Sequence, residues 1–297
     1  MFLSSKEMWD MPICGHDVKK HIPHWCGNIL YVLFLLILKV AFRLRVDGRE
    51  KLRAFQGQGL VCVCNHTSFL DVICIWVAAR TPQWVRFMAR DTLFDNGGGL
   101  LGQIISRVGA FPVSRDTADR TSIKRAARML KEGELVGIMP EGTRRGKSDR
   151  TPEIHAGAGF IAKMGKAPIM PLTVRNAELV KQKGKFVRFP KLSVEFGDPV
   201  LLEDFEFVEK RERLEAYTWY CMRECFALNQ RVSREEVDMV ALFPEGKDYT
   251  ALFAAHPIPV HDAAKLAASR SEAARASRLS ASDKADKADK ADKADKE

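Results

Sequence analysis

The sequence predicts an α/β fold in which a largely parallel sheet is flanked by helices. Short apolar runs of strand length, such as Leu60–Cys64 and Leu135–Met139, alternate along the chain with amphipathic stretches of helix length. Such alternation is typical of parallel sheets, because a parallel connection needs a crossover that is usually a helix. Of the 297 residues, 46% are hydrophobic, which is ordinary for a globular protein that buries a real core.

The N-terminal segment, residues 1–43, is expected to associate with a membrane. An apolar stretch of about 14 residues begins at Ile29 and is interrupted by Lys39, so it is short of the roughly 18 to 20 residues of a full span. Basic residues flank it: Lys19, Lys20, Arg43 and Arg45. We expect a helix in the bilayer interface, peripheral or monotopic, at the cytoplasmic face of the cell membrane against anionic lipid. A buried core helix and a tilted span over Trp25–Phe42 are the alternatives.

The predicted domain 44–235 carries the remaining strands and long helices. Strands are expected over 44–48, 60–64, 84–88, 109–115, 135–139, 167–174 and 192–197. Helices are expected over 72–79, 100–108, 120–131, 157–164 and 203–232. Gly97–Gly102 matches a dinucleotide-binding pattern by letter, but no strand leads directly into it, so we interpret it as a loop.

Two C-terminal segments follow this domain. Residues 236–260 form an extension in which Phe243–Gly246 is interpreted as a turn. Residues 261–297 are rich in alanine, serine and charge and end in Ala-Asp-Lys triplets. With so little apolar content, this tail is expected to be disordered or at most transiently helical.

A histidine and an aspartate stand where a predicted strand is followed by a helix. His66 comes after the strand at 60–64, and Asp71 lies five residues later in the first turn of the next helix. Ligands of open α/β sheets bind at the carboxyl ends of strands, so His66 is placed to act as a general base. Asp71 can accept a hydrogen bond from the other ring nitrogen and fix the tautomer. The alternative is structural: Ser68 and Asp71 also fit a helix capping box.

Arginines follow two further predicted strands. Arg115 ends the strand at 109–115, and Arg144 and Arg145 follow the strand at 135–139. All three are expected at the edge of the sheet that carries His66. A guanidinium presents a planar fork of donors that suits phosphate oxygens. Each arginine alone could be a solvated loop charge, but three at one edge favour an anion site.

The net charge bears on the class of binding partner, and the cysteine content bears on the redox compartment. The net charge of +9 indicates an anionic partner such as phosphate groups or a membrane surface. No zinc-finger spacing or RNA-recognition signature supports nucleic acid. The seven cysteines show no disulfide framework, which fits a reducing compartment. Cys62, Cys64 and His66 would share one strand face, so a metal site is conceivable, but buried thiols are the more common outcome.

Four blocks of residues stand in one order. Asn65–Asp71 reads N-H-x-S-x-x-D, Gly109–Arg115 ends in arginine, and Met139–Arg144 reads M-P-E-G-T-R. Pro168–Leu172 is an apolar strand with two prolines. Together, over about residues 44–200, they resemble the 1-acyl-sn-glycerol-3-phosphate acyltransferase family (glycerolipid acyltransferases), whose third block has phenylalanine in place of the methionine.

The resemblance implies transfer of a fatty acyl group from a thioester, acyl-CoA or acyl carrier protein, to the sn-2 hydroxyl of 1-acylglycerol 3-phosphate (lysophosphatidate). The product would be phosphatidate, in phospholipid biosynthesis. His66 would be the base and Asp71 its partner, with no metal, no cofactor beyond the thioester co-substrate and no covalent acyl-enzyme. The implied acceptor-site residues are Arg115, Glu141, Gly142, Thr143 and Arg144. Those implied to line the acyl region are Pro168, Ile169 and Pro171.

Three alternatives remain open at this point. The acceptor could be glycerol 3-phosphate or another lysophospholipid, since the motifs do not discriminate. A serine hydrolase would use Ser68 with His66 and Asp71, but no G-x-S-x-G elbow exists in the chain. A non-catalytic membrane phospholipid-binding protein would have no need of the histidine–aspartate pair.

Overall fold

The computed structural model of the chain describes residues 3–13, 21–80, 84–95, 99–114, 119–145, 151–182, 184 and 186–277. The strands are β1 (Arg45–Asp47), β2 (Leu60–Cys64), β3 (Val85–Arg90), β4 (Phe111–Val113), β5 (Leu135–Ile138), β6 (Ile169–Arg175) and β7 (Ser193–Phe196). The longer helices are α2 (His24–Val40), α4 (Phe69–Ala79), α6 (Leu100–Arg107), α7 (Arg120–Lys131), α8 (Gly157–Gly165) and α9 (Arg213–Gln230). Short helices are α1 (Ser5–Asp10), α3 (Arg49–Ala54), α5 (Thr92–Asp95), α10 (Met239–Leu242) and α11 (Thr250–Ala255).

The strands form one seven-stranded sheet in the order β1-β7-β6-β2-β5-β3-β4. Every neighbouring pair is parallel except β6 with β7. The predicted α/β fold with a largely parallel sheet is therefore confirmed. In the central pair, Val63 of β2 lies opposite Ile138 of β5. Continuing that register three residues further brings His66 level with Glu141, at the carboxyl ends of both strands.

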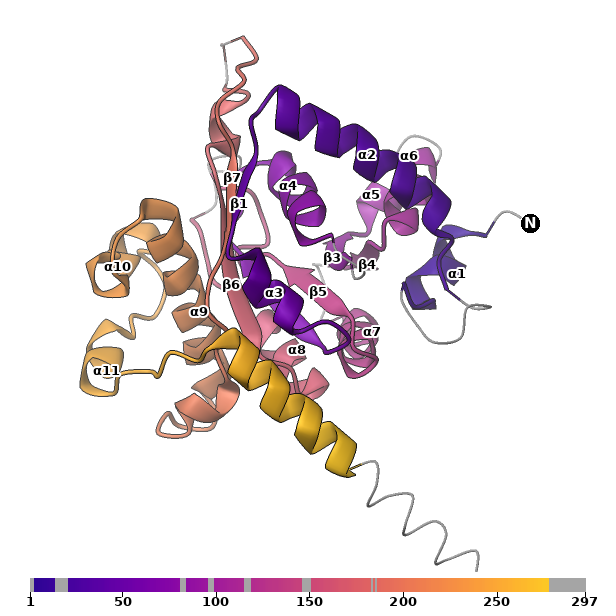
Figure 1. Cartoon of the computed structure of the whole chain (residues 1–297). Helices are drawn as coiled ribbons and strands as arrows, with labels where there is room; N and C mark the ends of the chain where they lie inside the picture. Colours follow the sequence, from indigo (N-terminus) through magenta and orange to yellow (C-terminus); the bar gives the residue numbers. More distant parts are fainter. Residues whose placement is uncertain are drawn as a thin grey trace, which may run out of the picture.

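Helices cover both faces of the sheet in two layers (Figure 1). One face, with Cys62, Cys64 and Met170, packs under α2, α3 and α4. The opposite face, with Val61 and Val63, packs under α7, α8, α9 and the short helices α10 and α11. Alternate residues of β2 thus enter different cores, as the period of two in a strand requires.

Helix α2 confirms the predicted N-terminal apolar helix but is buried on one side only. Leu38 is buried against the sheet-side core, and α2 packs on α4 and α6. Large apolar side chains on its other side are exposed: Trp25, Ile29, Val32, Leu33, Leu36, Ile37 and Val40. Over the part of the chain that the structure describes, every helix is too short or too polar to cross a bilayer.

The predicted helix over 203–232 begins later than expected. Leu202–Phe205 forms a 3-10 turn, and α9 begins only at Arg213. Phe205 folds back onto Tyr217, with ring centroids 5.0 Å apart. In one continuous helix these two residues would be about 18 Å apart, at 1.5 Å per residue. The contact between Phe205 and Tyr217 is therefore incompatible with one continuous helix over 203–232.

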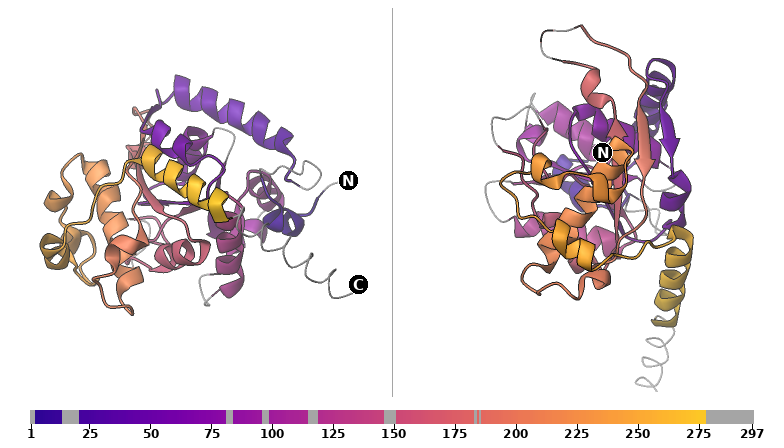
Figure 2. Two further views of the ribbon diagram at one scale, coloured as in Figure 1. Left: turned by 60° about the horizontal axis from the view of Figure 1, so that its bottom comes forward. Right: turned by 90° about the vertical axis from the view of Figure 1, so that its left-hand side faces the viewer.

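The tail predicted to be disordered is ordered in part. Residues 263–277 form a helix that packs through the small side chains of Ala263 and Ala267. The Gln58 side-chain amide donates to the Ala267 carbonyl at 2.8 Å, and the Arg270 guanidinium donates to that of Lys166 at 2.6 Å. Figure 2 shows this helix projecting past the body of the molecule. These tertiary contacts, which composition does not reveal, stabilise the helix.

Candidate active site

His66 lies in the loop between the carboxyl end of β2 and the start of α4. Three residues, Asn65, His66 and Thr67, follow the central strand before Ser68, which is the N-cap of α4. Asn65 is buried and its side-chain oxygen accepts from the Thr173 hydroxyl of β6 at 3.0 Å. The loop that carries His66 is therefore anchored to the neighbouring strand.

Asp71 fixes this loop from the first turn of α4. Its Oδ2 accepts from the Thr67 N–H at 2.7 Å, from the Ser68 N–H at 2.8 Å and faces His66 Nδ1 at 3.1 Å. The capping box is thus present, and the same carboxylate is also the partner of the histidine ring. One side chain thus makes the contacts of a helix capping box and also the contact with the histidine ring that a catalytic role would need.

The geometry leaves one ring nitrogen of His66 for chemistry. Because Nδ1 faces a buried carboxylate, it carries the proton, and Nε2 is the nitrogen that can accept one. The His66 side chain is 12% exposed and that of Asp71 is 1% exposed. The orienting carboxylate is shielded from water, while the ring remains reachable by a bound hydroxyl.

The third predicted block, Met139–Arg144 at the end of β5, bonds directly to this loop. Glu141 Oε1 accepts from the His66 N–H at 3.0 Å, and Oε2 accepts from Arg145 Nε at 2.9 Å. Burial raises the pKa of Glu141 above its ordinary value of 4.5, while the bonds from His66 and Arg145 oppose that rise. Gly142 has a φ of +65°, and a Cβ there would lie 3.3 Å from the His155 ring. Only glycine fits this turn without strain.

The two neighbouring arginines have different environments. Arg145 is paired with Glu141, whereas the Arg144 guanidinium lies 3.6 Å above the Phe69 ring. Within the described ranges no carboxylate pairs with Arg144. Thr143 beside it is exposed. Arg144 therefore presents a cation next to the loop that carries His66.

None of the remaining predicted site residues that the structure describes is brought to His66. Arg115 lies outside the described residues. Ile169 pairs with Val61 near the amino end of β2, and Pro171 pairs with Val63. Pro171 is thus about 10 Å along the strand direction from the level of His66, at roughly 3.3 Å per residue. Pro168, Ile169 and Pro171 are all buried, and Ile169 belongs to the core under α9. Their packing gives no support to an acyl-lining role.

Ser68 and the neighbouring main chain are largely committed to structure. Ser68 Oγ accepts from the Leu70 N–H at 3.3 Å, and within the described chain no bond joins it to His66. The N–H groups of Thr67 and Ser68 both donate to Asp71. Among the described residues, the Phe69 N–H at the start of α4 has no such partner. The serine-hydrolase arrangement is therefore absent from this loop.

The cysteines beside the site are core residues. Cys62 and Cys64 are buried, and burial raises the pKa of the Cys64 thiol well above its usual value. Among the residues that the structure describes, no group of three or more His, Cys, Asp or Glu side chains is arranged to hold a metal ion.

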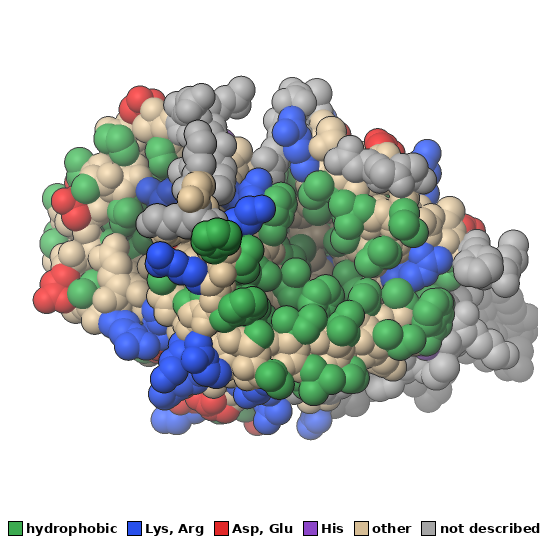
Figure 3. All heavy atoms as spheres, turned by 90° about the horizontal axis from the view of Figure 1, so that it is seen from above, with side chains coloured by type: hydrophobic (Ala, Val, Ile, Leu, Met, Phe, Trp, Pro, Cys, Tyr) green, Lys and Arg blue, Asp and Glu red, His purple; other side chains and the backbone are tan. Residues whose placement is uncertain are grey.

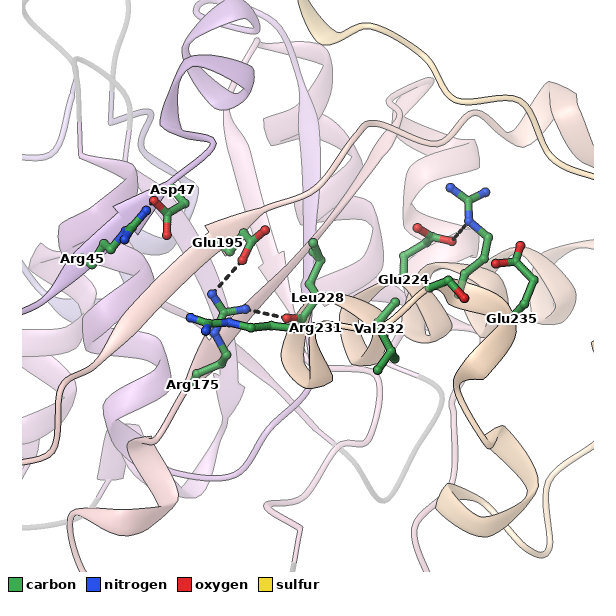
Figure 4. A pocket seen from close by; sticks show the side chains of 12 residues that line it. Arg45, Asp47, Arg175, Glu195, Glu224, Leu228, Arg231, Val232 and Glu235 are labelled. Atoms are coloured by element: carbon green, nitrogen blue, oxygen red, sulfur yellow. Dashed lines mark hydrogen bonds and ion pairs between the residues drawn. The ribbon is translucent and has the colours of Figure 1, made fainter.

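A hollow of about 710 Å³ lies away from His66, between β1, β7 and the end of α9 (Figure 4). In the sheet, β1 and β7 are at the opposite edge from β3 and β4. The charges of the hollow are mostly paired with each other: Arg45 with Asp47, Arg175 with Glu195, and Arg234 with Glu224. None of the predicted site residues lines it. We assign it no part in the chemistry of His66.

Sequence reasoning missed two contributions to the site. It placed Arg145 with Arg144 in one basic cluster, whereas only Arg145 holds Glu141. It gave no role to Phe69, which is 58% exposed and lies under Arg144. An exposed phenylalanine directly after a helix N-cap was the available signal for the second.

Comparisons with known proteins point in one direction. A family model described as Acyltransferase matches residues 43–175. A 1-acyl-sn-glycerol-3-phosphate acyltransferase from Bacillus subtilis (strain 168) is 35% identical over 212 residues, which cover 71% of this chain and 96% of that protein. The protein of that name from Streptococcus pneumoniae is 29% identical over 51% of this chain and 53% of its own length. The crystal structure of the 1-acyl-sn-glycerophosphate acyltransferase from Thermotoga maritima has a similar fold, with a TM-score of 0.50 and 21% identity over 69% of this chain and 82% of that one.

Proposed function

The chain belongs to the 1-acyl-sn-glycerol-3-phosphate acyltransferase family, and we propose that it acylates the sn-2 hydroxyl of 1-acylglycerol 3-phosphate to give phosphatidate. The acyl group comes from a thioester, and both acyl-CoA and acyl carrier protein are candidate donors. The observation that carries the proposal is the His66 Nδ1–Asp71 contact of 3.1 Å at the carboxyl end of β2.

The reaction needs a base, because an alcohol is a poor nucleophile at neutral pH. In the proposed mechanism His66 Nε2 takes the proton of the acceptor hydroxyl as its oxygen attacks the thioester carbonyl. Asp71 stabilises the imidazolium that forms, and His66 then returns the proton to the departing thiolate. The Phe69 N–H, which has no acceptor among the described residues and lies at the start of α4, is the proposed main-chain donor to the oxyanion. No step requires a metal or a covalent acyl-enzyme.

We assign binding of the acceptor's phosphate group to arginine side chains. Arg144 has no carboxylate partner among the described residues and lies beside the His66 loop, which supports this role, and Arg115 is its proposed partner by family resemblance. Gly142 and Thr143 form the turn that presents Arg144. Glu141 already accepts bonds from His66 and Arg145, so its proposed role is to hold the loop rather than to bind the glycerol.

The acceptor is an amphiphile, so the enzyme is proposed to work at the cytoplasmic face of a membrane. The exposed apolar face of α2 supports this, together with Leu100, Leu101 and Ile104 of α6. Figure 3, viewed onto the top of the molecule as drawn in Figure 1, shows hydrophobic side chains gathered around a hollow, with lysine and arginine side chains at its rim. Contiguous apolar surface of this kind marks an interaction site, and basic side chains attract anionic lipid.

A lipid-product assay tests the proposal. Purified protein is given an acyl thioester and one acceptor at a time: lysophosphatidate, glycerol 3-phosphate or a neutral lysophospholipid. We expect phosphatidate from lysophosphatidate, and loss of at least about 1,000-fold in kcat for His66→Ala, the size seen when a catalytic base is removed. His256→Ala is the matched control, because His256 is exposed at the C-cap of α11, where its ring contacts the Leu252 carbonyl and stacks on Phe207.

Three outcomes would contradict parts of the proposal. Unchanged turnover in His66→Ala would show that His66 is not the general base. Acylation of a different acceptor would change the substrate. Loss of the thioester without an acylated product would indicate hydrolysis.

A further inference from the structure

We propose that Arg145 is a positioning residue that couples the C-terminal extension, residues 236–260, to the His66 loop. The inference rests on the proposed function. Arg145 lies directly after the block Met139–Arg144, and its side chain joins two parts of the chain that are 97 residues apart. It does not contact the reacting atoms; it acts through Glu141.

At one end, Arg145 holds the peptide group of His66 from both sides. The Arg145 N–H donates to the His66 carbonyl at 2.8 Å. Its side chain donates from Nε to Glu141, which in turn accepts from the His66 N–H at 3.0 Å. The donor and acceptor groups of the catalytic histidine's main chain are thus both bound through this one residue and its glutamate.

At the other end, Arg145 is bound by the C-terminal extension. Its Nη1 donates to the carbonyl of Leu242, the last residue of α10, at 3.0 Å. Its guanidinium lies 4.7 Å from the ring centroid of Phe243 and 5.1 Å from that of Phe226 in α9. Phe243 is 3% exposed and packs edge-on against Phe226. The extension therefore fixes where the guanidinium lies.

The chemistry of arginine suits this position. A planar guanidinium can donate to a carboxylate and a carbonyl while its face stacks on aromatic rings. Lysine offers a compact point charge and cannot make both bonds and the stack in one geometry. Arg144, one residue earlier, stacks on Phe69 instead and takes no part in this link to the extension.

The consequence is that residues outside the family match at 43–175 set the geometry of catalysis. A shift of the His66 loop misaligns the base with the acceptor hydroxyl, which lowers kcat. Neither Arg145 nor Phe243 is assigned to substrate binding, so KM for either substrate should change little. A misplacement of about 1 Å at a reacting group can cost about 100-fold in rate.

The test compares Arg145→Met, Arg145→Lys and Phe243→Leu with the double variant Arg145→Met/Phe243→Leu. We expect Arg145→Met to lower kcat by about 10- to 100-fold with KM within about twofold, and Arg145→Lys to recover part of the loss. Phe243→Leu should lower kcat by about threefold to tenfold in the wild-type background. It should have no further effect when Arg145 is methionine, because the link is already broken.

Phe253→Leu is the matched control. Phe253 lies in the same extension, is 4% exposed, and stacks near Arg223 rather than Arg145. It should lower stability as Phe243→Leu does and leave kcat of the folded enzyme unchanged. Equal loss of kcat in both variants, or additive effects in the double variant, would overturn the inference.

A readout that needs no turnover separates this inference from the proposed function. Amide hydrogen exchange should rise selectively over residues 64–72 in Arg145→Met and in Phe243→Leu, because the His66 N–H loses its ordered acceptor. Wild-type protein that acylates nothing would refute the proposed function alone. Unchanged exchange over residues 64–72 would refute the coupling alone.

Discussion

The two long helices on opposite faces of the sheet contrast in a way that the hydrophobic effect alone does not explain. Helix α2 has 17 residues, of which only Gly27 and Leu38 are buried. Helix α9 has 18 residues, of which eleven are buried, although it carries four charged side chains. The more apolar helix is thus the more exposed one.

The difference lies in what covers each helix, and we propose that the uncovered face of α2 is a lipid-binding surface. Helix α9 is enclosed by the sheet, by α8 and by the C-terminal extension, whose Phe253 stacks on Trp219. Its apolar area is already removed from water and contributes to folding. The apolar area on the outer face of α2 is still exposed to water. Helix α2 packs on α4, the helix that begins at the His66 loop. Burial of α2 in lipid would therefore bring the site to the bilayer.

The largest predicted effect is on stability, and it is confined to the α9 side. Trp219→Ala should lower the free energy of unfolding by about 3–5 kcal/mol, because a buried aromatic ring leaves a cavity. Val32→Ala on the exposed face of α2 should change it by no more than about 0.5 kcal/mol. Urea unfolding in the absence of lipid measures both, and similar losses from the two variants would erase the contrast.

The next effect is on membrane binding, and it is confined to α2. Val32→Asp/Leu36→Asp places two charges on one face of the helix, where the native side chains are 54% and 57% exposed. Each would lose about 1 kcal/mol or more of lipid burial, so binding to anionic vesicles should weaken at least about tenfold.

Val240→Asp on α10 provides the control for that variant, since Val240 is 53% exposed but lies on the α9 side. Flotation with vesicles compares the variants at equal fold stability. If Val240→Asp weakens binding as much as the α2 variant, the binding face is not α2.

The smallest effect is a pH dependence from Glu141. Its pKa is raised by burial, so the folded state binds a proton more tightly than the unfolded state does. Stability from this group therefore falls as pH rises from 4.5 through the raised pKa of the folded state. Glu141→Gln should remove that component, so the stability difference between wild type and variant should vary with pH in this window. A difference that is constant with pH would contradict the assignment.

Sequence reasoning predicted most of the sheet and the contact between His66 and Asp71. The β2 strand and the His66–Asp71 pair followed from local pattern, because strand length, helix capping and five-residue spacing are local properties. The distinction between Arg144 and Arg145 did not, since it depends on Leu242 and Phe243 far along the chain.

Tertiary contacts also account for the elements that were predicted wrongly. The delayed start of α9 depends on Phe205 packing against Tyr217, and the helix at 263–277 depends on contacts with Gln58 and Lys166. None of these pairings is visible in local hydrophobic periodicity, which reports only whether a segment has an apolar face.

The central claim is that the His66 base acts on an acceptor held in a membrane that the face of α2 meets. The most direct test gives wild type, His66→Ala and Val32→Asp/Leu36→Asp two acceptors: long-chain lysophosphatidate in vesicles and a short-chain lysophosphatidate that stays dissolved. We predict that His66→Ala loses activity on both acceptors, while the α2 variant loses it on vesicles and keeps it on the dissolved acceptor. Equal loss on both acceptors in the α2 variant, or retained activity in His66→Ala, would contradict the account.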